Sequence, residues 1–293
     1  MPTTPPIVSV LVTVYNREHY LEATLLSILA STFEDIEVIV VDDCSADKSV
    51  SIAQDIAKHD TRVKCFVNEK NLGDYGNRNR AASFATGSYL KYLDADDLIY
   101  RYSLAAMVDA MEKFPDAALA LSRNVIDPDV PYPRVYEPRE FFREHYFGKS
   151  PIGVGPSAAI IRRECFAAVG GFSGRQFVGD TELWIKLAEK WPIVTLPPAL
   201  VWWRQHEGQQ MQLEMQKPEV LNIRAQLELQ ALQATTHLTS VEKLAAASRV
   251  RRLHARRLLR MAIIQRRPGI AWKLSNSFGM NTAELANALF RRQ

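Results

Sequence analysis

One stretch of the chain decides how the rest is interpreted: Tyr89-Leu90-Lys91-Tyr92-Leu93-Asp94-Ala95-Asp96-Asp97. Its first half is typical of a buried strand, and its second half places three carboxylates within four positions. Carboxylates this close raise each other's pKa unless a cation or hydrogen-bond donors offset their charge. Two interpretations follow. The carboxylates hold a divalent metal, since Mg²⁺ and Mn²⁺ prefer oxygen ligands, or they form a solvated turn in which Asp97 precedes a helix from about Ser103.

Strands and helices are expected to alternate ahead of this stretch. Apolar, β-branched runs predict strands at residues 7–14, 36–41 and 63–67, and helical spacing predicts helices at residues 18–30, 48–58 and 74–85. This alternation predicts an α/β fold with a mostly parallel sheet and helices on both of its faces. Ligands of such sheets bind outside the carboxyl ends of the strands, near a switch in strand order.

Three of the predicted strands end in polar side chains, which should face one cleft. They are Thr13, Tyr15 and Asn16 after the first strand, Asp42 and Asp43 after the second, and Asp94 to Asp97 after the fourth. The turn after the first strand lacks G-x-G-x-x-G, and no G-x-x-x-x-G-K-[ST] occurs, so a dinucleotide-binding Rossmann enzyme is disfavoured. A nucleotide bound here would depend on a metal for its phosphates.

Composition indicates a globular protein of 293 residues, 47% hydrophobic and 24% charged, with room for one large α/β domain and an appendage. Three scattered cysteines without metal-ligand spacing indicate a reducing compartment. No secretory signal is recognised, and no apolar run approaches the ~20 residues of a membrane span. We therefore expect a cytoplasmic protein.

Four motifs in order resemble the N-terminal half of family 2 glycosyltransferases, which have the GT-A fold. They are Val12-Thr13-Val14-Tyr15-Asn16, Val40-Val41-Asp42-Asp43-Cys44-Ser45, Asn79-Arg80-Ala81 with Ala85-Thr86-Gly87, and Leu93-Asp94-Ala95-Asp96-Asp97. The resemblance implies a GT-A-type, Rossmann-like sheet that binds a nucleotide diphosphate sugar and transfers the sugar with inversion.

The resemblance also implies how the nucleotide base is held. Thr13, Tyr15 and Asp43, with Asp42 beside them, would form the base site. Tyr15 would stack on the base and Asp43 would accept a hydrogen bond from a ring N–H. An aromatic face with a carboxylate acceptor selects a uracil-like edge, so UDP is favoured.

The phosphate end of the donor is assigned in the same way. Asp94 and Asp96 would contact the nucleotide. The extra Asp at position 97 leaves open which carboxylate binds Mn²⁺ or Mg²⁺ at the diphosphate, and Asp96 and Asp97 are favoured. Arg78 precedes the Asn79 motif, where a basic side chain can meet a phosphate; a surface helix arginine is the alternative.

Phe177-Val178-Gly179-Asp180-Thr181-Glu182-Leu183-Trp184 resembles the acidic motif of the family's second half, whose Asp is the general base. By this match Asp180 deprotonates the acceptor hydroxyl. The family usually has Glu where Gly179 stands. An N-cap role for Asp180 is the structural alternative, and Glu182 is the weaker competitor for the base.

Trp203-Arg204-Gln205-His206 resembles the family's downstream Arg-x-His segment. Arg204 would neutralise the leaving diphosphate, and His206 would complete the metal shell; a structural histidine is the alternative.

Between these motifs we expect a helix at residues 103–114, strands at 117–122 and 157–161, a short helix at 164–169, a turn at 170–172, and a strand pair at 193–196 and 200–203. Four prolines between residues 127 and 139 predict an irregular crossing segment.

The chain beyond residue 208 differs in charge, with fourteen Lys and Arg against five Asp and Glu. Its arginines recur on one helix face at positions 249, 252, 256 and 260, opposite Val250, Leu253, Met261 and Ile264. This helix either lies on an anionic membrane or packs its apolar side on the catalytic domain or a second copy. No aromatic platform accompanies the charge, so nucleic acid is not expected.

Together these observations predict a GT-A catalytic domain at residues 1–208, with a nucleotide half (1–100) and an acceptor half (101–208), and a helical basic extension at 209–293. The partners are a nucleotide-sugar donor and a saccharide or lipid-linked acceptor. One alternative is a nucleotidyltransferase, although this sequence lacks the glycine-rich phosphate loop that such enzymes normally need. The other alternative is a non-catalytic scaffold that binds sugar nucleotides.

Overall fold

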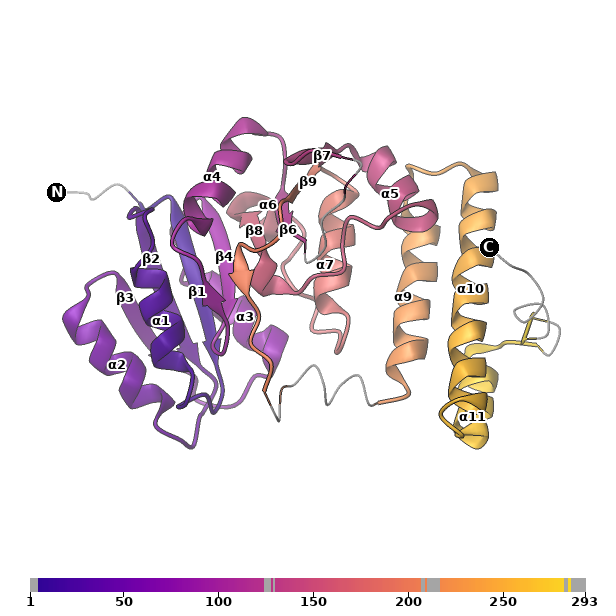
Figure 1. The fold of residues 1–293 in the computed structure, drawn as a ribbon, viewed down its shortest axis with the longest axis horizontal. Coiled ribbons are helices and arrows are strands. Elements are labelled where there is room, and N and C mark those ends of the chain that lie inside the picture. Colours follow the sequence, from indigo (N-terminus) through magenta and orange to yellow (C-terminus); the bar gives the residue numbers. More distant parts are fainter. Residues whose placement is uncertain are drawn as a thin grey trace. The chain divides into compact units, whose positions relative to one another are not determined.

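A computed structural model describes residues 5–123, 128, 130–206, 209, 217–281 and 284–285. The chain divides into two compact units. Unit 1 contains residues 1–141 and 151–204, and unit 2 contains residues 142–150 and 205–293. Figure 1 labels the elements of both units.

Unit 1 opens with the predicted alternation of strands and helices (Figure 1). Its first elements are β1 (Val8–Val14), α1 (Leu21–Leu29), β2 (Ile36–Asp42), α2 (Ser49–His59), β3 (Val63–Val67), α3 (Asp74–Ser83) and β4 (Tyr89–Asp94). It continues with β5 (Leu98–Ile99), α4 (Ser103–Lys113), β6 (Leu119–Ser122), β7 (Arg134–Tyr136), the start of α5 (Pro138–Phe147), a 3-10 turn (Pro156–Ala158), β8 (Ala159–Arg162), α6 (Arg163–Ala168), α7 (Gly179–Ala188), β9 (Ile193–Leu196) and β10 (Val201–Trp202).

The central sheet has eight strands in the order β3-β2-β1-β4-β8-β6-β9-β7. The strands β3, β2, β1 and β4 are parallel, β8 runs antiparallel between β4 and β6, and β7 is an antiparallel edge. The fold is therefore the expected α/β type with a mostly parallel sheet. Strand order reverses at β1, which lies between β2 and β4, so the switch point is at the carboxyl ends of β1 and β4.

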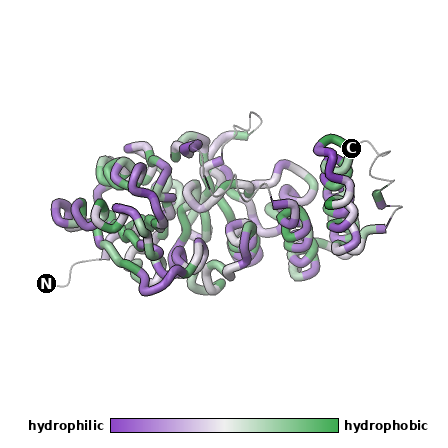
Figure 2. The backbone as a smooth tube through the Cα atoms, turned by 90° about the horizontal axis from the view of Figure 1, so that it is seen from below, coloured by the Kyte–Doolittle hydropathy of each residue, from purple (hydrophilic) through white to green (hydrophobic). Residues whose placement is uncertain are grey.

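Helices cover both faces of this sheet (Figure 1). On one face, alternate residues of β1 pack with buried residues of α1, α2 and α4, including Leu25, Ala53 and Met107. The helix α3 packs on β1 and β2, and α6 packs on β8. Figure 2 shows hydrophobic residues concentrated along the central strands of unit 1. Burial of both faces explains why these strands are continuous apolar runs without alternation.

Two predictions for the middle of the chain were wrong. The proline-rich segment is not wholly irregular: β7 pairs with β9, and α5 begins at Pro138. Both outcomes are compatible with proline, which is tolerated beside edge strands and in the first turn of a helix. Residues 124–127 and 129 of this segment lie outside the described residues. The strand at 200–203 pairs with the unpredicted β5 in a separate two-stranded sheet, while β9 joins the central sheet.

Unit 2 contains α9 (Val220–Ala234), α10 (Ser240–Ile263) and α11 (Pro268–Phe278), together with the end of α5. Thr239 caps α10, and its side chain accepts a hydrogen bond from the Glu242 N–H in a complete capping box. A small core joins α10 and α11 through Ala255, Leu258, Met261, Ala271, Leu274 and Met280. Among the helices that the structure describes, none combines the length and hydropathy needed to cross a bilayer.

Candidate active site

The strand ends that carry the predicted site residues are adjacent in the sheet. In the β1–β4 pairing Thr13 lies opposite Asp94, and in the β1–β2 pairing Val14 lies opposite Asp42. The backbone N–H of Asp43 donates to the Val14 carbonyl at 2.8 Å. The three strand ends therefore meet at the switch point, as the parallel sheet requires.

Asp97 is the most unusual carboxylate at this edge. Its side chain is 1% exposed; Oδ1 accepts from the Arg204 backbone N–H at 3.1 Å, and Oδ2 is buried with no hydrogen-bond partner among the described residues. Burial, and then the charge of Asp94, raise the pKa of Asp97 to about 7. A solvated turn does not explain a buried carboxylate with an unused oxygen. Either a proton or a bound cation would offset the charge of this group.

Asp94 is neutralised by Arg78. The guanidinium of Arg78 donates to Asp94 Oδ1 and to Asp74 Oδ1, each at 2.8 Å. Burial acts to raise the pKa of Asp94, but the charge and hydrogen bond of Arg78 outweigh it and hold this pKa below its usual value. Arg78 is 6% exposed, and its Nη1 is buried without a partner among the described residues. Arg78 is therefore a buried residue of α3 that contacts the strand end at Asp94, and not a surface arginine.

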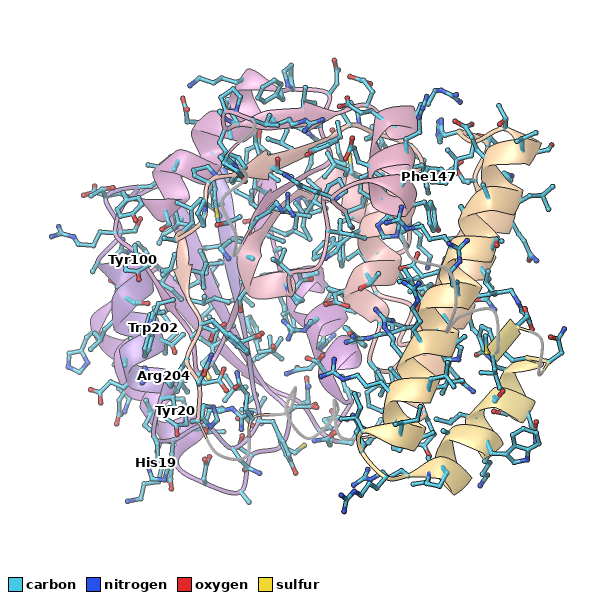
Figure 3. All side chains as sticks on the ribbon, turned by 45° about the vertical axis from the view of Figure 1, so that its right-hand side comes forward. His19, Tyr20, Tyr100, Phe147, Trp202 and Arg204 are labelled. Carbon is cyan, nitrogen blue, oxygen red and sulfur yellow. The ribbon has the colours of Figure 1, made fainter. Side chains whose placement is uncertain are left out.

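Asp94, Asp96 and Asp97 form what we call the aspartate cluster. Arg17 and Arg204 contact Asp96 of this cluster. Asp96 Oδ2 accepts from Arg17 Nε at 3.0 Å, and its backbone carbonyl accepts from Arg204 Nε at 2.8 Å. The Arg204 guanidinium lies 5.0 Å from the Tyr20 ring centroid and 4.8 Å from that of Trp202. Figure 3 labels these three side chains, which lie along one side of unit 1. Positive charge from two loops thus borders the aspartates.

The side chains at these strand ends include candidate oxygen ligands for a divalent metal. In the part of the chain that the structure describes, no three His, Cys, Asp or Glu side chains form a group able to hold a metal ion. The unpaired oxygen of Asp97 nevertheless has the chemistry of a hard-cation ligand. His206 is half-buried and belongs to unit 2, so its place in a metal shell stays a prediction.

The predicted base site differs in accessibility from the aspartates. Tyr15 is 51% exposed just past β1, so its ring is accessible for stacking, and Thr13 is half-buried. Asp42 is buried; its Oδ1 accepts from the Ser45 N–H at 2.8 Å. Its Oδ2 has no hydrogen-bond partner among the described residues.

Asp43 has a structural role, whereas its part in the base site stays a prediction. Its carboxylate accepts from the backbone N–H groups of Leu72 and Gly73 and from the Asn68 side chain, at 2.8 to 2.9 Å. These bonds fix the loop that leads into α3. A carboxylate has about four lone-pair sites, so one remains for a ligand.

Asp180 lies in the first turn of α7. The N-cap is Val178, so the N-cap alternative for Asp180 is not what the structure has. Its Oδ1 accepts from the Thr181 N–H at 2.6 Å, and the side chain is half-buried. The N-terminal end of a helix is a favourable place for a negative charge.

The helix α3 joins the aspartate cluster to α7. Tyr75, Arg78 and Asn79 are three and four residues apart and so share one face. The Tyr75 hydroxyl accepts from the Gly179 N–H at 3.0 Å. Asn79 brackets Phe172, donating to its carbonyl at 2.8 Å and accepting from its N–H at 3.0 Å.

Gly171 and Gly179 lie at these contacts, where a larger side chain would clash. A Cβ at Gly179 would lie 2.7 Å from the Tyr75 ring, and one at Gly171 would lie 2.7 Å from Asn79 Oδ1. Gly171 also has a φ of 65°, which disfavours other residues. Gly179, the departure from the family pattern, thus makes room for Tyr75.

Sequence reasoning missed Lys91 and Ser157. Lys91 is fully buried in β4, where its Nζ donates to the carbonyls of Tyr92 and Ser157, and burial lowers its pKa to about 7. The Ser157 hydroxyl accepts from the Asp94 N–H at 2.9 Å. A lysine inside an apolar strand was a visible signal. Nothing in the sequence around Ser157 marks it.

Comparison with known proteins connects this geometry to a family. The model of "Glycosyl transferase family 2" matches residues 9–170, more than half of the chain. A beta-1,3-glucosyltransferase of Campylobacter jejuni that acts on GalNAc(5)-diNAcBac-PP-undecaprenol is 36% identical over 104 residues, which are 35% of this chain and 34% of that protein. A putative teichuronic acid biosynthesis glycosyltransferase of Bacillus subtilis is 40% identical over 92 residues, 31% and 36% of the two chains.

Solved structures share the fold. TarS 1–349 of S. aureus in complex with UDP-GlcNAc aligns with a TM-score of 0.63 at 20% identity, covering 96% of this chain and 79% of that one. A mannosyltransferase of Pyrobaculum calidifontis with GDP-Man and Mn²⁺ aligns with a TM-score of 0.59 at 21% identity, covering 98% and 87%.

The chain spans 42%, 33% and 34% of the lengths of three curated relatives. The family model nevertheless runs from β1 to the end of α6 and includes the strand ends that carry Thr13, Asp42 and Asp94 to Asp97. The chain belongs to glycosyl transferase family 2.

Proposed function

We propose that this protein is an inverting, metal-dependent glycosyltransferase acting in the cytoplasm on a saccharide or lipid-linked acceptor, in surface polysaccharide or glycolipid synthesis. Its donor would be a nucleotide diphosphate sugar, with UDP favoured over GDP or dTDP, and the group moved a hexosyl or N-acetylhexosaminyl unit. The observation that carries the proposal is the buried Asp97 carboxylate, whose Oδ2 has no partner among the described residues, beside Asp94 and Arg78.

The donor site follows from the chemistry of the strand ends. The exposed Tyr15 ring offers a stacking face, and Asp43 has a lone pair for a ring N–H. Arg78 and Arg204 offer positive charge to the diphosphate, and the Nη1 of Arg78, which has no partner among the described residues, suits a phosphate oxygen. Bound Mn²⁺ or Mg²⁺, held by Asp96 and Asp97, would offset the charge of the leaving diphosphate.

Transfer needs one proton acceptor on the acceptor side. In the proposed step, Asp180 takes the proton of the acceptor hydroxyl, whose oxygen forms a bond to the anomeric carbon. The bond from that carbon to the phosphate oxygen breaks on the opposite face, and the configuration inverts. Arg78 and Arg204 stabilise the negative charge that develops on the departing nucleotide diphosphate. No covalent enzyme intermediate is required.

The proposal is tested in two steps. Thermal shifts with UDP-, GDP- and dTDP-sugars, with and without Mn²⁺, identify the donor. Asp180→Asn should then retain donor binding and lose transfer by a factor on the order of a thousand. Glu182→Gln, in the same turn of α7, is the matched control and should keep transfer. Undiminished transfer by Asp180→Asn would remove Asp180 from the role, and donor binding without turnover under any metal would favour the scaffold alternative.

A further inference from the structure

The turn between α10 and α11 exposes large apolar side chains. Ile263 and Ile264 are 66% and 69% exposed at the end of α10, and Trp272 is 57% exposed in α11. With Ile270 they form what we call the apolar tip: Ile263, Ile264, Ile270 and Trp272. The helices do not need these side chains for packing, because their core is made by other residues such as Leu258, Met261 and Leu274.

The buried face of α10 differs from the apolar face that the sequence predicted. Of the apolar residues expected on one face of α10, Met261 is buried, but Leu253 is 37% exposed and Ile264 is at the apolar tip. The buried stripe of α10 instead contains Ala246, His254, Ala255, Leu258 and Met261. Packing within unit 2 therefore covers part of the apolar surface and leaves the tip uncovered among the described residues.

Positive charge surrounds the apolar tip. Between Glu242 and Glu284 the sequence has ten Lys and Arg and no Asp or Glu. Arg260, Arg266, Arg267 and Lys273 are all exposed next to the tip. Within the described part of the chain these four side chains form no ion pair, whereas Arg251 pairs with Glu284. The end of α10, the turn and the start of α11 thus expose unpaired basic groups and apolar groups together within residues 260–273.

We propose that the α10–α11 turn is a docking surface for the anionic headgroup layer of a lipid bilayer. Basic side chains are attracted to acidic headgroups, and isoleucines with an interfacial tryptophan insert at the boundary of the acyl chains. This inference does not depend on the proposed transfer reaction.

Two other occupants fit less well. A second copy meeting the same turn would bring two unpaired basic clusters together, which is unfavourable. A nucleic acid would be attracted by the charge but would leave the isoleucines without a role, since stacking platforms are aromatic. An anionic bilayer satisfies both the basic and the apolar side chains.

Vesicle flotation of the full-length chain tests the proposal. The wild-type protein should float with vesicles of phosphatidylcholine and phosphatidylglycerol in equal parts, and should remain in solution with phosphatidylcholine alone. The variant Ile263→Ser/Ile264→Ser/Trp272→Ser should lose at least about tenfold in partitioning. Arg266→Glu/Arg267→Glu should lose as much, and added salt should weaken wild-type binding.

Matched controls are available in the same unit and elsewhere. Val241→Ser/Leu244→Ser removes two side chains that are 77% and 74% exposed at the opposite end of α10, and should leave flotation unchanged. Lys58→Glu/Lys113→Glu is the matching charge control on the exposed helices of unit 1. All variants change exposed positions, so their thermal melts should match that of the wild type.

Four results would overturn the proposal that the α10–α11 turn binds an anionic bilayer. Equal flotation of tip variants and wild type would do so, as would equal binding to both vesicle types. A wild-type dimer that the apolar variant converts to a monomer in sedimentation would assign the tip to a second copy. Retardation of an RNA oligonucleotide without vesicle binding would assign the basic side chains to nucleic acid. Flotation uses no donor or acceptor, so its outcome is separate from that of the transfer assay.

Discussion

The Tyr75 hydroxyl accepts a hydrogen bond from the backbone N–H of Gly179 at 3.0 Å, across 104 positions of sequence. Tyr75 precedes Arg78 by one helical turn, and Gly179 precedes Asp180, so a single side chain of α3 joins the aspartate cluster to the start of α7. The ring also stacks on Phe172, with 5.1 Å between centroids. This contact fixes the first turn of α7 relative to the strand ends.

Tyr75→Phe should therefore reduce turnover while leaving donor binding intact. The substitution keeps the ring but removes the acceptor of the Gly179 N–H, so the first turn of α7 loses its anchor. We expect kcat to fall roughly tenfold, with the donor KM unchanged. Steady-state kinetics measure both. Tyr146→Phe is the control, because Tyr146 also donates from a buried hydroxyl, to the Glu228 carbonyl at 3.0 Å, but lies in unit 2. Equal losses of kcat in the two variants would argue against a positioning role.

Gly179→Ala should destabilise the fold because the new Cβ would lie 2.7 Å from the Tyr75 ring. Overpacking of this kind costs about 1–3 kcal/mol in the free energy of unfolding. Adding Tyr75→Ala should remove the clash, so a double-mutant cycle should show a favourable coupling. Gly155→Ala, where a Cβ meets no atom within 4 Å, should be nearly neutral. If the cycle showed no coupling, Gly179 would owe its place to something other than Tyr75.

The strand ends could be predicted from sequence, and the contacts that organise them could not. The strand at Val63–Val67 has its predicted bounds, and Thr13, Asp42 and Asp94 meet because carboxyl ends of parallel strands share an edge. These results follow from apolar runs and from the connectivity of parallel sheets. The fold class was confirmed, whereas the roles of the individual site residues stay predictions.

Contacts between distant elements leave weaker traces in a sequence. The Ser157 hydroxyl accepts a hydrogen bond from the Asp94 N–H because β8 lies antiparallel beside β4. No local sequence pattern predicts that strand pairing. The two-residue strand β5 is too short for a periodicity signal. Gly179 was noted as a departure from the family pattern, but its partner Tyr75 could not be found without coordinates.

Asp97→Asn should abolish stabilisation by Mn²⁺. The buried Oδ2 has no hydrogen-bond partner among the described residues and is a candidate cation ligand, for which an amide is a poor replacement. At a Mn²⁺ concentration of 100 times Kd the wild type should gain about 2.7 kcal/mol in the free energy of unfolding, and the variant should gain almost none. Thermal melts with and without Mn²⁺ measure the difference.

The matched control for this experiment is Asp42→Asn. Asp42 is also buried with an Oδ2 that lacks a described partner, but it ends β2 and is not a predicted metal ligand. It should keep the Mn²⁺ response. A wild type that EDTA and Mn²⁺ leave unchanged, or an Asp97→Asn variant that still responds, would contradict metal binding by Asp97.

Glu37 gives a pH dependence that is independent of the active site. It is 4% exposed in β2, and its carboxylate accepts hydrogen bonds of 2.7 Å from Ser9, Thr86 and Lys64. Burial acts to raise the pKa of Glu37, but these hydrogen bonds outweigh it and lower the pKa to about 2 from an ordinary 4.5. A lowered pKa means that the folded state binds fewer protons than the unfolded state. The ionised group therefore stabilises the fold above pH 4.5, and this stabilisation is lost as the pH falls toward 2.

Glu37→Gln should accordingly lower the free energy of unfolding by about 3 kcal/mol at pH 7, and by progressively less as the pH falls below 4.5. Urea denaturation of both proteins at a series of pH values measures this gap. Asp55→Asn is the control: Asp55 pairs with Lys58 on the exposed side of α2, where solvent screens the charges, so its unfolding should match that of the wild type. A gap that stays constant from pH 7 to the acid range would show that Glu37 acts through packing alone, because only the ionised carboxylate gives a contribution that protonation removes.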